Sequence, residues 1–310
     1  MDVRLFGIIK LNSPLSHISQ SISTNSYLEE QPIIQEDGTI QKVFCYSGNA
    51  LRGQIRDSMA EYLLKKVGRK VSKDTFHLLF SGGKIGGDQV VDLEAAKIIR
   101  KNIPPLAILG GGIGNQIIGG KCKFQMNYPL CKEAVRVLPE ILHKRASLTS
   151  YSDMVFEKSY TRTDDSKNDL NCDYFEGEQK KKNKGVPADQ MRMTNELIAA
   201  GTELYSRIDL IDVNEIEIGA LISGFSEVST NPYIGGQSNK GHGYADFSYA
   251  YQSDNDLVEE FLQIKEGKLF LSPLSGSFMS KYDKHLDIIK TSNIADTPKE
   301  IKVMEEFWKL

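Results

Sequence analysis

Apolar and polar side chains alternate over residues 3–12, at the start of the chain. A period of two residues is typical of a half-buried β-strand, because successive side chains of a strand point to opposite faces. We therefore predict a first strand here. Residues 13–46 are polar and have no clear period. We expect a loop region in which Asp37 and Gly38 form the turn of a hairpin.

The pattern becomes helical after residue 47. Ser47 or Asn49 can cap the start of this helix by accepting hydrogen bonds from free backbone N–H groups. Arg52 and Arg56 are four residues apart and share one helix face. Apolar side chains recur at every fourth position and predict a separate, buried stripe. They are Leu51, Ile55, Met59 and Leu63.

Two interpretations of the arginine pair are open. Beside a helix N-terminus, Arg52 and Arg56 can bind a phosphate group, because the free N–H groups and the helix dipole favour the same anion. The two guanidinium groups can also pair with Asp57, with Glu61 or with another subunit.

The rest of the chain is predicted to alternate between strands and helices. Residues 150–200 interrupt the series, because they are polar and charged, and we expect a protruding insertion there. Residues 252–310 form a C-terminal extension with two short helices and a strand at residues 268–271. The other expected elements are a helix at 88–101, strands at 117–127 and 201–213, a helix at 214–225 and a strand at 244–251. The order predicts an α+β fold with a ferredoxin-like or RRM-like βαββαβ core, whose sheet is a common platform for RNA.

A glycine-rich loop, YIGGQSNKGHGY at residues 233–244, joins the last helix of this core to its last strand. Glycines allow a backbone or a ligand to come close. Backbone N–H groups and polar side chains then offer hydrogen-bond donors to an anion. The side chains concerned are Ser238, Asn239, Lys240 and His242. The loop indicates phosphate or nucleic acid, and a glycine-rich hairpin or a helix-capping loop is the structural alternative.

Composition narrows the function classes. Of 310 residues, 40% are hydrophobic and 25% are charged, which is ordinary for a globular protein with a sizeable core. No apolar run approaches the roughly 20 residues that cross a bilayer, and the first residues lack a signal-peptide core. We expect a cytoplasmic protein without a membrane partner. The four cysteines have no CxxC spacing, so we expect reduced thiols, no metal site and no cofactor.

The net charge of −3 does not by itself indicate a nucleic-acid binder. Basic residues nevertheless gather in two stretches, at residues 52–70 and 180–184. Local basic stripes on an acidic chain would suit a subunit that packs beside identical copies along a polyanion. Solvated surface loops are the alternative.

Five short motifs follow one another between residues 3 and 251. They are SPLSH at 13–17, GNALRGQIR at 48–56, TRTDD at 161–165, AGTEL at 200–204 and GGQSNKGHG at 235–243. In this order they resemble the RAMP-superfamily backbone subunits of CRISPR effector complexes. The forms SGNALRG and TRTDD look most like the type IV backbone subunit.

This resemblance implies a single domain over residues 1–310, in which residues 150–200 are a thumb and residues 252–310 an extension. Several copies would line up along one CRISPR guide RNA, beside other effector-complex subunits. Each thumb would kink the guide, and the open bases would pair with a target nucleic acid, expected to be DNA and often plasmid DNA. The implied RNA-binding residues are Ser16, His17, Asn49, Arg52, Arg56, Arg162, Gly235, Gly236, Ser238, Asn239, Lys240 and His242.

The resemblance also bears on catalysis. Type III relatives cut target RNA with an aspartate in the loop after the first strand, and Glu30 stands at the matching place here. A glutamate is one methylene longer and would displace a metal or a water by about an ångström, so we expect a non-catalytic protein. A metal-dependent ribonuclease on the same scaffold is the alternative. A His17–His242 acid–base pair and an unrelated ferredoxin-like binding module are also possible.

Overall fold

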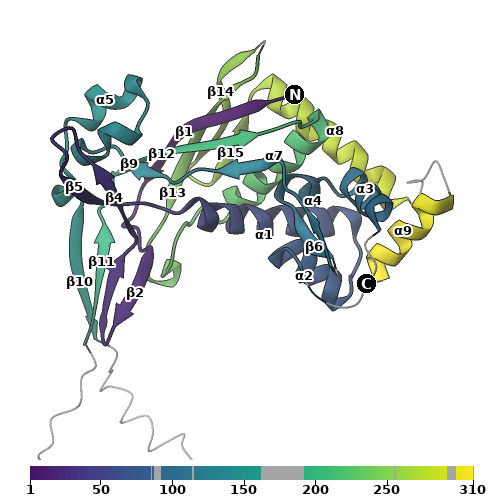
Figure 1. The fold of residues 1–310 in the computed structure, drawn as a ribbon, viewed down its shortest axis with the longest axis horizontal. Helices are drawn as coiled ribbons and strands as arrows, with labels where there is room; N and C mark the ends of the chain where they lie inside the picture. The colour runs from purple at the N-terminus through teal and green to yellow at the C-terminus, as the bar shows by residue number, and fades with distance from the viewer. Residues whose placement is uncertain are drawn as a thin grey trace, which may run out of the picture.

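The computed structural model describes residues 1–84, 86, 92–113, 115–161, 192–254, 256–291 and 298–309. Its centre is an antiparallel sheet with the strand order β15-β14-β13-β1-β12-β8, and β9 also pairs with β12 (Figure 1). The strands are β1 (Val3–Leu11), β8 (Cys122–Phe124), β9 (Tyr128–Pro129), β12 (Glu203–Leu210), β13 (Ala245–Gln252), β14 (Leu257–Lys265) and β15 (Lys268–Leu271).

Four of these strands and two helices form the ferredoxin-like core. Helix α1 (Gly48–Val67) follows β1, and helix α7 (Glu215–Thr230) lies between β12 and β13. The order β13-β1-β12-β8 places the first and third strands of the βαββαβ plan in the centre, paired antiparallel. The predicted fold class is confirmed.

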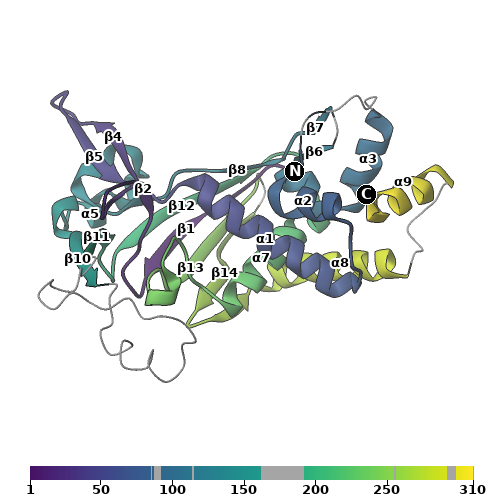
Figure 2. The ribbon, with the colours of Figure 1, turned by 90° about the horizontal axis from the view of Figure 1, so that it is seen from below.

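The two faces of the sheet differ in burial. Leu5 and Ile9 of β1 are at most 1% exposed, because α1 and α7 pack side by side against their face (Figure 2). On the opposite face Phe6 and Ile8 are half-buried. Alternation along a strand produces this difference, as the sequence predicted.

Helix α1 begins and ends as its sequence indicates. Ser47 is its N-cap, with Oγ accepting the Ala50 N–H at 3.1 Å, and Gly68 ends the helix in a left-handed conformation. The predicted apolar stripe is at most 1% exposed at each of Leu51, Ile55, Met59 and Leu63.

A helical region flanks α1 on the side away from the strands at residues 155–161 and 192–198 (Figure 1). Three expectations here are corrected. The helix expected from residue 88 is described only from Leu93, where Asp92 caps it. The strand expected at 117–127 is two strands, at 116–118 and 122–124, and the chain bends at Lys121 between them. The extension contains an additional strand, β14, and a long helix, α8. The elements are α2 (Lys73–Ser81), α3 (Leu93–Asn102), α4 (Pro104–Leu109), β6 (Gly111–Ile113), β7 (Gln116–Ile118), α8 (Pro273–Lys290) and α9 (Pro298–Lys309).

The chain on either side of residues 162–191 belongs to a second sheet of four strands in the order β10-β11-β3-β2, which we call the base of the thumb. They are β2 (Ile18–Ile22), β3 (Asn25–Leu28), β10 (Val155–Thr161) and β11 (Arg192–Ile198). The loop expected at residues 13–46 is therefore wrong in part, because pairing with the distant β11 orders a polar segment that has no period of its own. The hairpin turn at Asp37 and Gly38 is present, between β4 (Glu30–Ile34) and β5 (Ile40–Phe44).

Short elements complete the described chain. They are η1 (Lys132–Val137), α5 (Glu140–Ala146), η2 (Tyr151–Asp153) and η3 (Ser238–Lys240). In the part of the chain that is described, no helix combines the length and the apolar character needed to cross a membrane.

Candidate nucleic-acid interface

The first turn of α1 lies beside the segment that follows β1. His17 Nε2 accepts the backbone N–H of Ser47 at 3.3 Å, and the imidazole packs edge-on against Tyr46 with ring centroids 4.9 Å apart. Asn49 is exposed in this turn. The helix start therefore presents a polar side chain and free N–H groups on a fixed support.

The glycine-rich loop packs closely on the same segment. The Gly236 N–H donates to the Ser16 carbonyl at 2.7 Å, and the Gly243 N–H donates to the Pro14 carbonyl at 2.8 Å. Gly235 has φ +71°, and a Cβ there would lie 2.3 Å from the Ser16 carbonyl oxygen. The glycines thus serve close backbone approach. The hydroxyl of Ser16 is buried, so this residue contributes its carbonyl to the loop.

The middle of the loop is open to solvent. Ser238, Asn239 and Lys240 form a short 3-10 turn and are all exposed. Gln54 of α1 donates to the Tyr233 carbonyl at 2.7 Å, which ties the start of the loop to α1. Three predicted contact residues therefore share one exposed turn, held by neighbouring elements.

The loop also contacts the base of the thumb. His242 is 2% exposed, and its Nε2 lies 2.5 Å from the phenol oxygen of Tyr160 on β10. Lys240 Nζ lies 4.1 Å from the centroid of the Tyr160 ring. Asn195 on β11 donates to Gln237 Oε1 at 3.1 Å. Sequence reasoning missed Tyr160, Asn195 and Gln237, because no spacing connects β10 and β11 with a loop more than 40 residues away.

Both histidines favour the neutral state. Burial lowers the pKa of His17, and the nearby Glu29 opposes this only in part. Burial also lowers the pKa of His242, and the ammonium groups of Lys158 and Lys240 lower it further. His242 therefore acts by holding the loop, and a direct contact with RNA would require it to leave its buried place. The two histidines hydrogen-bond to different elements, Ser47 and Tyr160.

The two arginines of α1 turn inward. Arg56 is 6% exposed, and its guanidinium donates to the carbonyls of Leu109 at 2.9 Å and Gly110 at 3.1 Å. Arg52, half-buried, also donates to the Leu109 carbonyl. Burial and the neighbouring Arg52 lower the pKa of Arg56 to about 10. Free carbonyls at the C-terminal end of α4 attract cations. The sequence analysis did not consider these carbonyls as partners of the two arginines.

The remaining basic residues of α1 are engaged within the chain. Lys65 pairs with Glu61 at 2.9 Å and with Glu227 at 2.8 Å, and Lys66 pairs with Asp283 at 3.3 Å. Glu61 is thus a partner of Lys65, while the arginines bind carbonyls. Arg162 and the lysine run at 180–184 lie outside the described residues.

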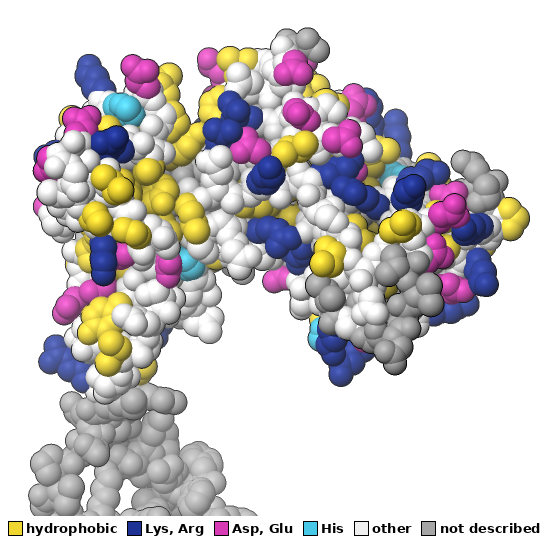
Figure 3. Space-filling view, viewed as in Figure 1, with side chains coloured by type: hydrophobic (Ala, Val, Ile, Leu, Met, Phe, Trp, Pro, Cys, Tyr) yellow, Lys and Arg dark blue, Asp and Glu magenta, His cyan; other side chains and the backbone are white. Residues whose placement is uncertain are grey.

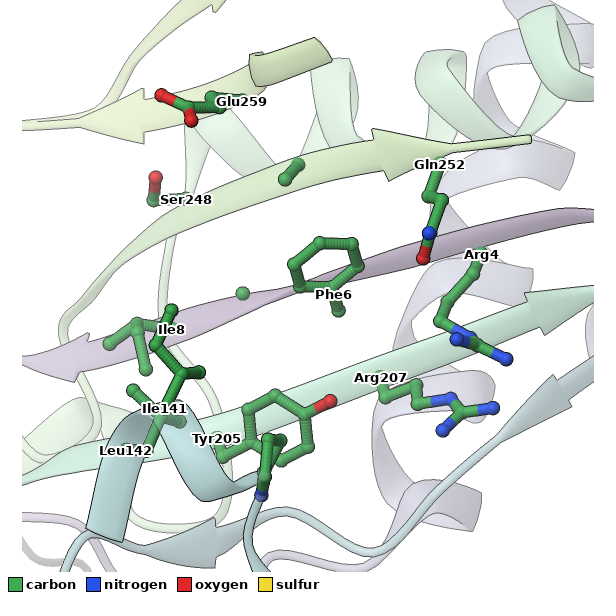
Figure 4. A pocket seen from close by; sticks show the side chains of 13 residues that line it. Arg4, Phe6, Ile8, Ile141, Leu142, Tyr205, Arg207, Ser248, Gln252 and Glu259 are labelled. Atoms are coloured by element: carbon green, nitrogen blue, oxygen red, sulfur yellow. The ribbon is translucent and has the colours of Figure 1, made fainter. Parts of the chain in front are cut away.

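The open face of the central sheet forms a separate groove of about 460 Å³ with α5 (Figure 4). Its lining is largely apolar and includes Phe6 and Tyr205. Arg4 and Arg207 at one end both pair with the single carboxylate of Asp209, at 3.3 and 2.9 Å. The groove therefore offers less free positive charge than the glycine-rich loop.

The residue considered for catalysis has a partner of its own. Glu30 is exposed, and its Oε1 accepts the Tyr151 hydroxyl at 2.7 Å. Within the described ranges, no group of three or more His, Cys, Asp or Glu side chains is placed to hold a metal ion. The carboxylates of the TRTDD motif, Asp164 and Asp165, lie outside those ranges.

Comparisons with known proteins find a similarity of structure but no match to a protein-family model or a curated protein. Among solved structures, a chain of a Type IV-B CRISPR complex superposes with a TM-score of 0.57 and 16% sequence identity, covering 83% of this chain and 92% of that one. A likeness at this level of identity establishes a shared fold.

Proposed function

We propose that this chain is a backbone subunit of a CRISPR effector complex, most like the type IV kind, and binds guide RNA without cutting it. Several copies bind along one guide, beside other subunits, and leave its bases free to pair with a target, which we expect to be DNA. The protein holds the RNA backbone, and base pairing supplies the sequence specificity.

One observation carries the proposal. The loop that carries the exposed turn at Ser238–Lys240 is held between the segment at residues 14–17, Gln54 in the second turn of α1, and the base of the thumb. The molecule is hollowed between the thumb and the helical region, so an extended polyanion has room beside these elements (Figure 3). The shared fold with a chain of a Type IV-B CRISPR complex supports the same assignment.

The predicted residues divide into two roles. Asn49, Ser238, Asn239 and Lys240 are exposed and are proposed to contact phosphates. Arg52 has donors beyond the one that binds Leu109, since a guanidinium has five N–H groups, and is proposed to reach a phosphate with these. The buried or backbone-bonded residues are proposed to position the others. They are Ser16, His17, Arg56, Gly235, Gly236 and His242.

The first experiment is co-expression with a repeat–spacer RNA, with ribonuclease added to half of the purified sample. We expect a large particle with a high ratio of absorbance at 260 nm to that at 280 nm, which carries RNA of uniform length. Ribonuclease should decrease the size of the particle if the enzyme can reach the bound RNA. A monomer free of nucleic acid under both conditions would overturn the proposal.

A double variant tests the assigned surface. Asn49→Ala with Lys240→Ala should weaken binding of every RNA sequence alike, about fivefold, and reduce the slope of log affinity against log salt by about 0.7. Lys144→Ala, an exposed lysine on α5, is the matched control. Equal affinities for the double variant and the wild type would contradict the assigned surface.

Catalysis is tested separately. A target RNA paired to the guide should remain intact with Mg²⁺ or Mn²⁺ present, for the wild type and for Glu30→Gln alike. Cleavage at regular intervals that Glu30→Gln abolishes would establish the ribonuclease alternative.

A further inference from the structure

We propose that Lys158, Tyr160 and Lys240 form a binding site for one phosphate group of the RNA backbone, where the thumb base meets the glycine-rich loop. The inference rests on the proposed function and deepens it, because it adds two thumb residues to the contact surface. The thumb and the loop would then hold the same phosphate from two sides.

The geometry places three side chains from two distant segments together. Lys158 and Tyr160 are two residues apart on β10, so they share a face of that strand. Lys158 Nζ lies 5.4 Å from the centroid of the Tyr160 ring, and Lys240 Nζ from the glycine-rich loop lies 4.1 Å from it. The electron-rich faces of an aromatic ring attract ammonium groups, and both lysines are exposed.

The charge balance at this place favours an anion. The two ammonium groups are separated by less than about 10 Å, within the distance over which charges interact at physiological salt. Neither lysine forms an ion pair with a carboxylate in the described part of the chain, and each lies over the aromatic ring. A phosphate between them would offset their mutual repulsion and accept hydrogen bonds from both.

Buried contacts behind the ring keep the site in place. Asn195 lies opposite Lys158 in the β10–β11 register and is 1% exposed, and its amide donates to Gln237 of the loop. The buried His242 is hydrogen-bonded to the phenol of Tyr160. These bonds fix the loop against the thumb before any ligand arrives, which reduces the entropy that binding must overcome.

His242 provides an internal sensor of the site. The groups that face it are the phenol of Tyr160, the two ammonium groups and the Pro14 backbone. Burial lowers its pKa below the usual value, and the two ammonium groups lower the pKa further. A bound phosphate would offset their charge and raise the pKa of His242. By reciprocity, RNA would bind more tightly as the pH falls towards the pKa of His242.

The test uses the full chain and a fluorescein-labelled oligouridine of about eight nucleotides, short enough to occupy one site. Lys158→Ala should weaken binding about fivefold and reduce the salt slope by about 0.7, and Lys158→Arg should restore both. Tyr160→Leu, which removes the ring under both lysines, should weaken binding about threefold. Tyr160→Phe keeps the ring but loses the hydrogen bond to His242, so it should weaken binding less than Tyr160→Leu does.

Two further readings decide between this site and simpler explanations. NMR titration of His242 should show a higher pKa with oligouridine than without it, whereas inorganic phosphate at the same concentration should leave the pKa unchanged if the site takes a backbone phosphate.

Lys144→Ala should bind like the wild type. If Lys144→Ala and Lys158→Ala lose the same RNA affinity, the binding depends only on the overall charge of the protein, and the proposal is overturned. A Lys158→Ala protein with the affinity and the salt slope of the wild type would also overturn it. Wild-type protein that binds no RNA at all would instead refute the proposed function.

Discussion

Two pairs of cations lie near the proposed interface, and they behave in opposite ways. Arg52 and Arg56 are four residues apart on one helix, and both donate to backbone carbonyls at the end of α4. Lys158 and Lys240 are far apart in sequence, yet both reach the ring of Tyr160 and are exposed. Both arginines that the sequence makes conspicuous bind carbonyls of the fold, and only Arg52 keeps donors for a ligand, while both lysines that the sequence conceals are exposed. Helical spacing shows which residues share a face but not what covers that face.

The largest expected effect concerns the buried arginine. Arg56→Leu leaves the Gly110 carbonyl without its guanidinium partner and should lower the free energy of unfolding by about 3 kcal/mol. Lys158→Ala should change it by no more than about 0.5 kcal/mol. Urea unfolding followed by circular dichroism measures both. An Arg56→Leu protein with unchanged stability but weakened RNA binding would reverse the comparison.

The next prediction concerns the close packing of Gly243 in the loop that carries Lys240. Gly243 has φ +88°, and a Cβ there would lie 2.0 Å from the Ile234 carbonyl oxygen, whereas Gly241 has φ +81° and open space around it. Gly241→Ala should cost about 1 kcal/mol for the left-handed backbone alone. Gly243→Ala should cost about 2 kcal/mol more and weaken RNA binding as well. Thermal unfolding and oligouridine titration of both variants test this, and equal losses would show that the contact is unimportant.

A smaller effect should appear on acidification. The folded-state pKa values of His17, His242 and His285 are all lowered, chiefly by burial. Below the unfolded value of about 6.5, the unfolded chain therefore binds protons that the folded chain does not, so stability must fall as the pH falls. His242→Gln should make the loss of stability between pH 7 and pH 5.5 smaller than in the wild type. The same pH dependence in both proteins would show that His242 does not contribute.

The smallest effect concerns the basic residues further along α1. Lys65 is exposed and paired with Glu61 and Glu227, so Lys65→Ala should lower stability by about 0.5 kcal/mol or less. Because its charge is already offset, RNA affinity should stay within about twofold of the wild type. A salt slope reduced as much as in Lys158→Ala would extend the interface along α1.

Local patterns predicted the parts of the site that are made locally. Ser47 is the cap of α1, as one of the two expected possibilities, and the exposed polar turn of the glycine-rich loop lies where its sequence indicated. The phosphate roles of Asn49 and Lys240 remain predictions. Tyr160 and Asn195 could not have been found in this way, because β12 and α7 separate them in the sequence from their partners His242 and Gln237.

The sequence by itself determined the helices α1 and α7, the alternating strands β1, β12 and β13, and their order, because periodicity, capping and glycine conformations depend on neighbouring residues. Those features were enough for the ferredoxin-like core. Only the tertiary structure decided that the polar segment after β1 joins the thumb sheet, that Arg56 is buried, and that Lys158 and Lys240 meet over one ring. Each of these depends on contacts between distant segments, which form when the sheet and helices pack and which no local pattern encodes.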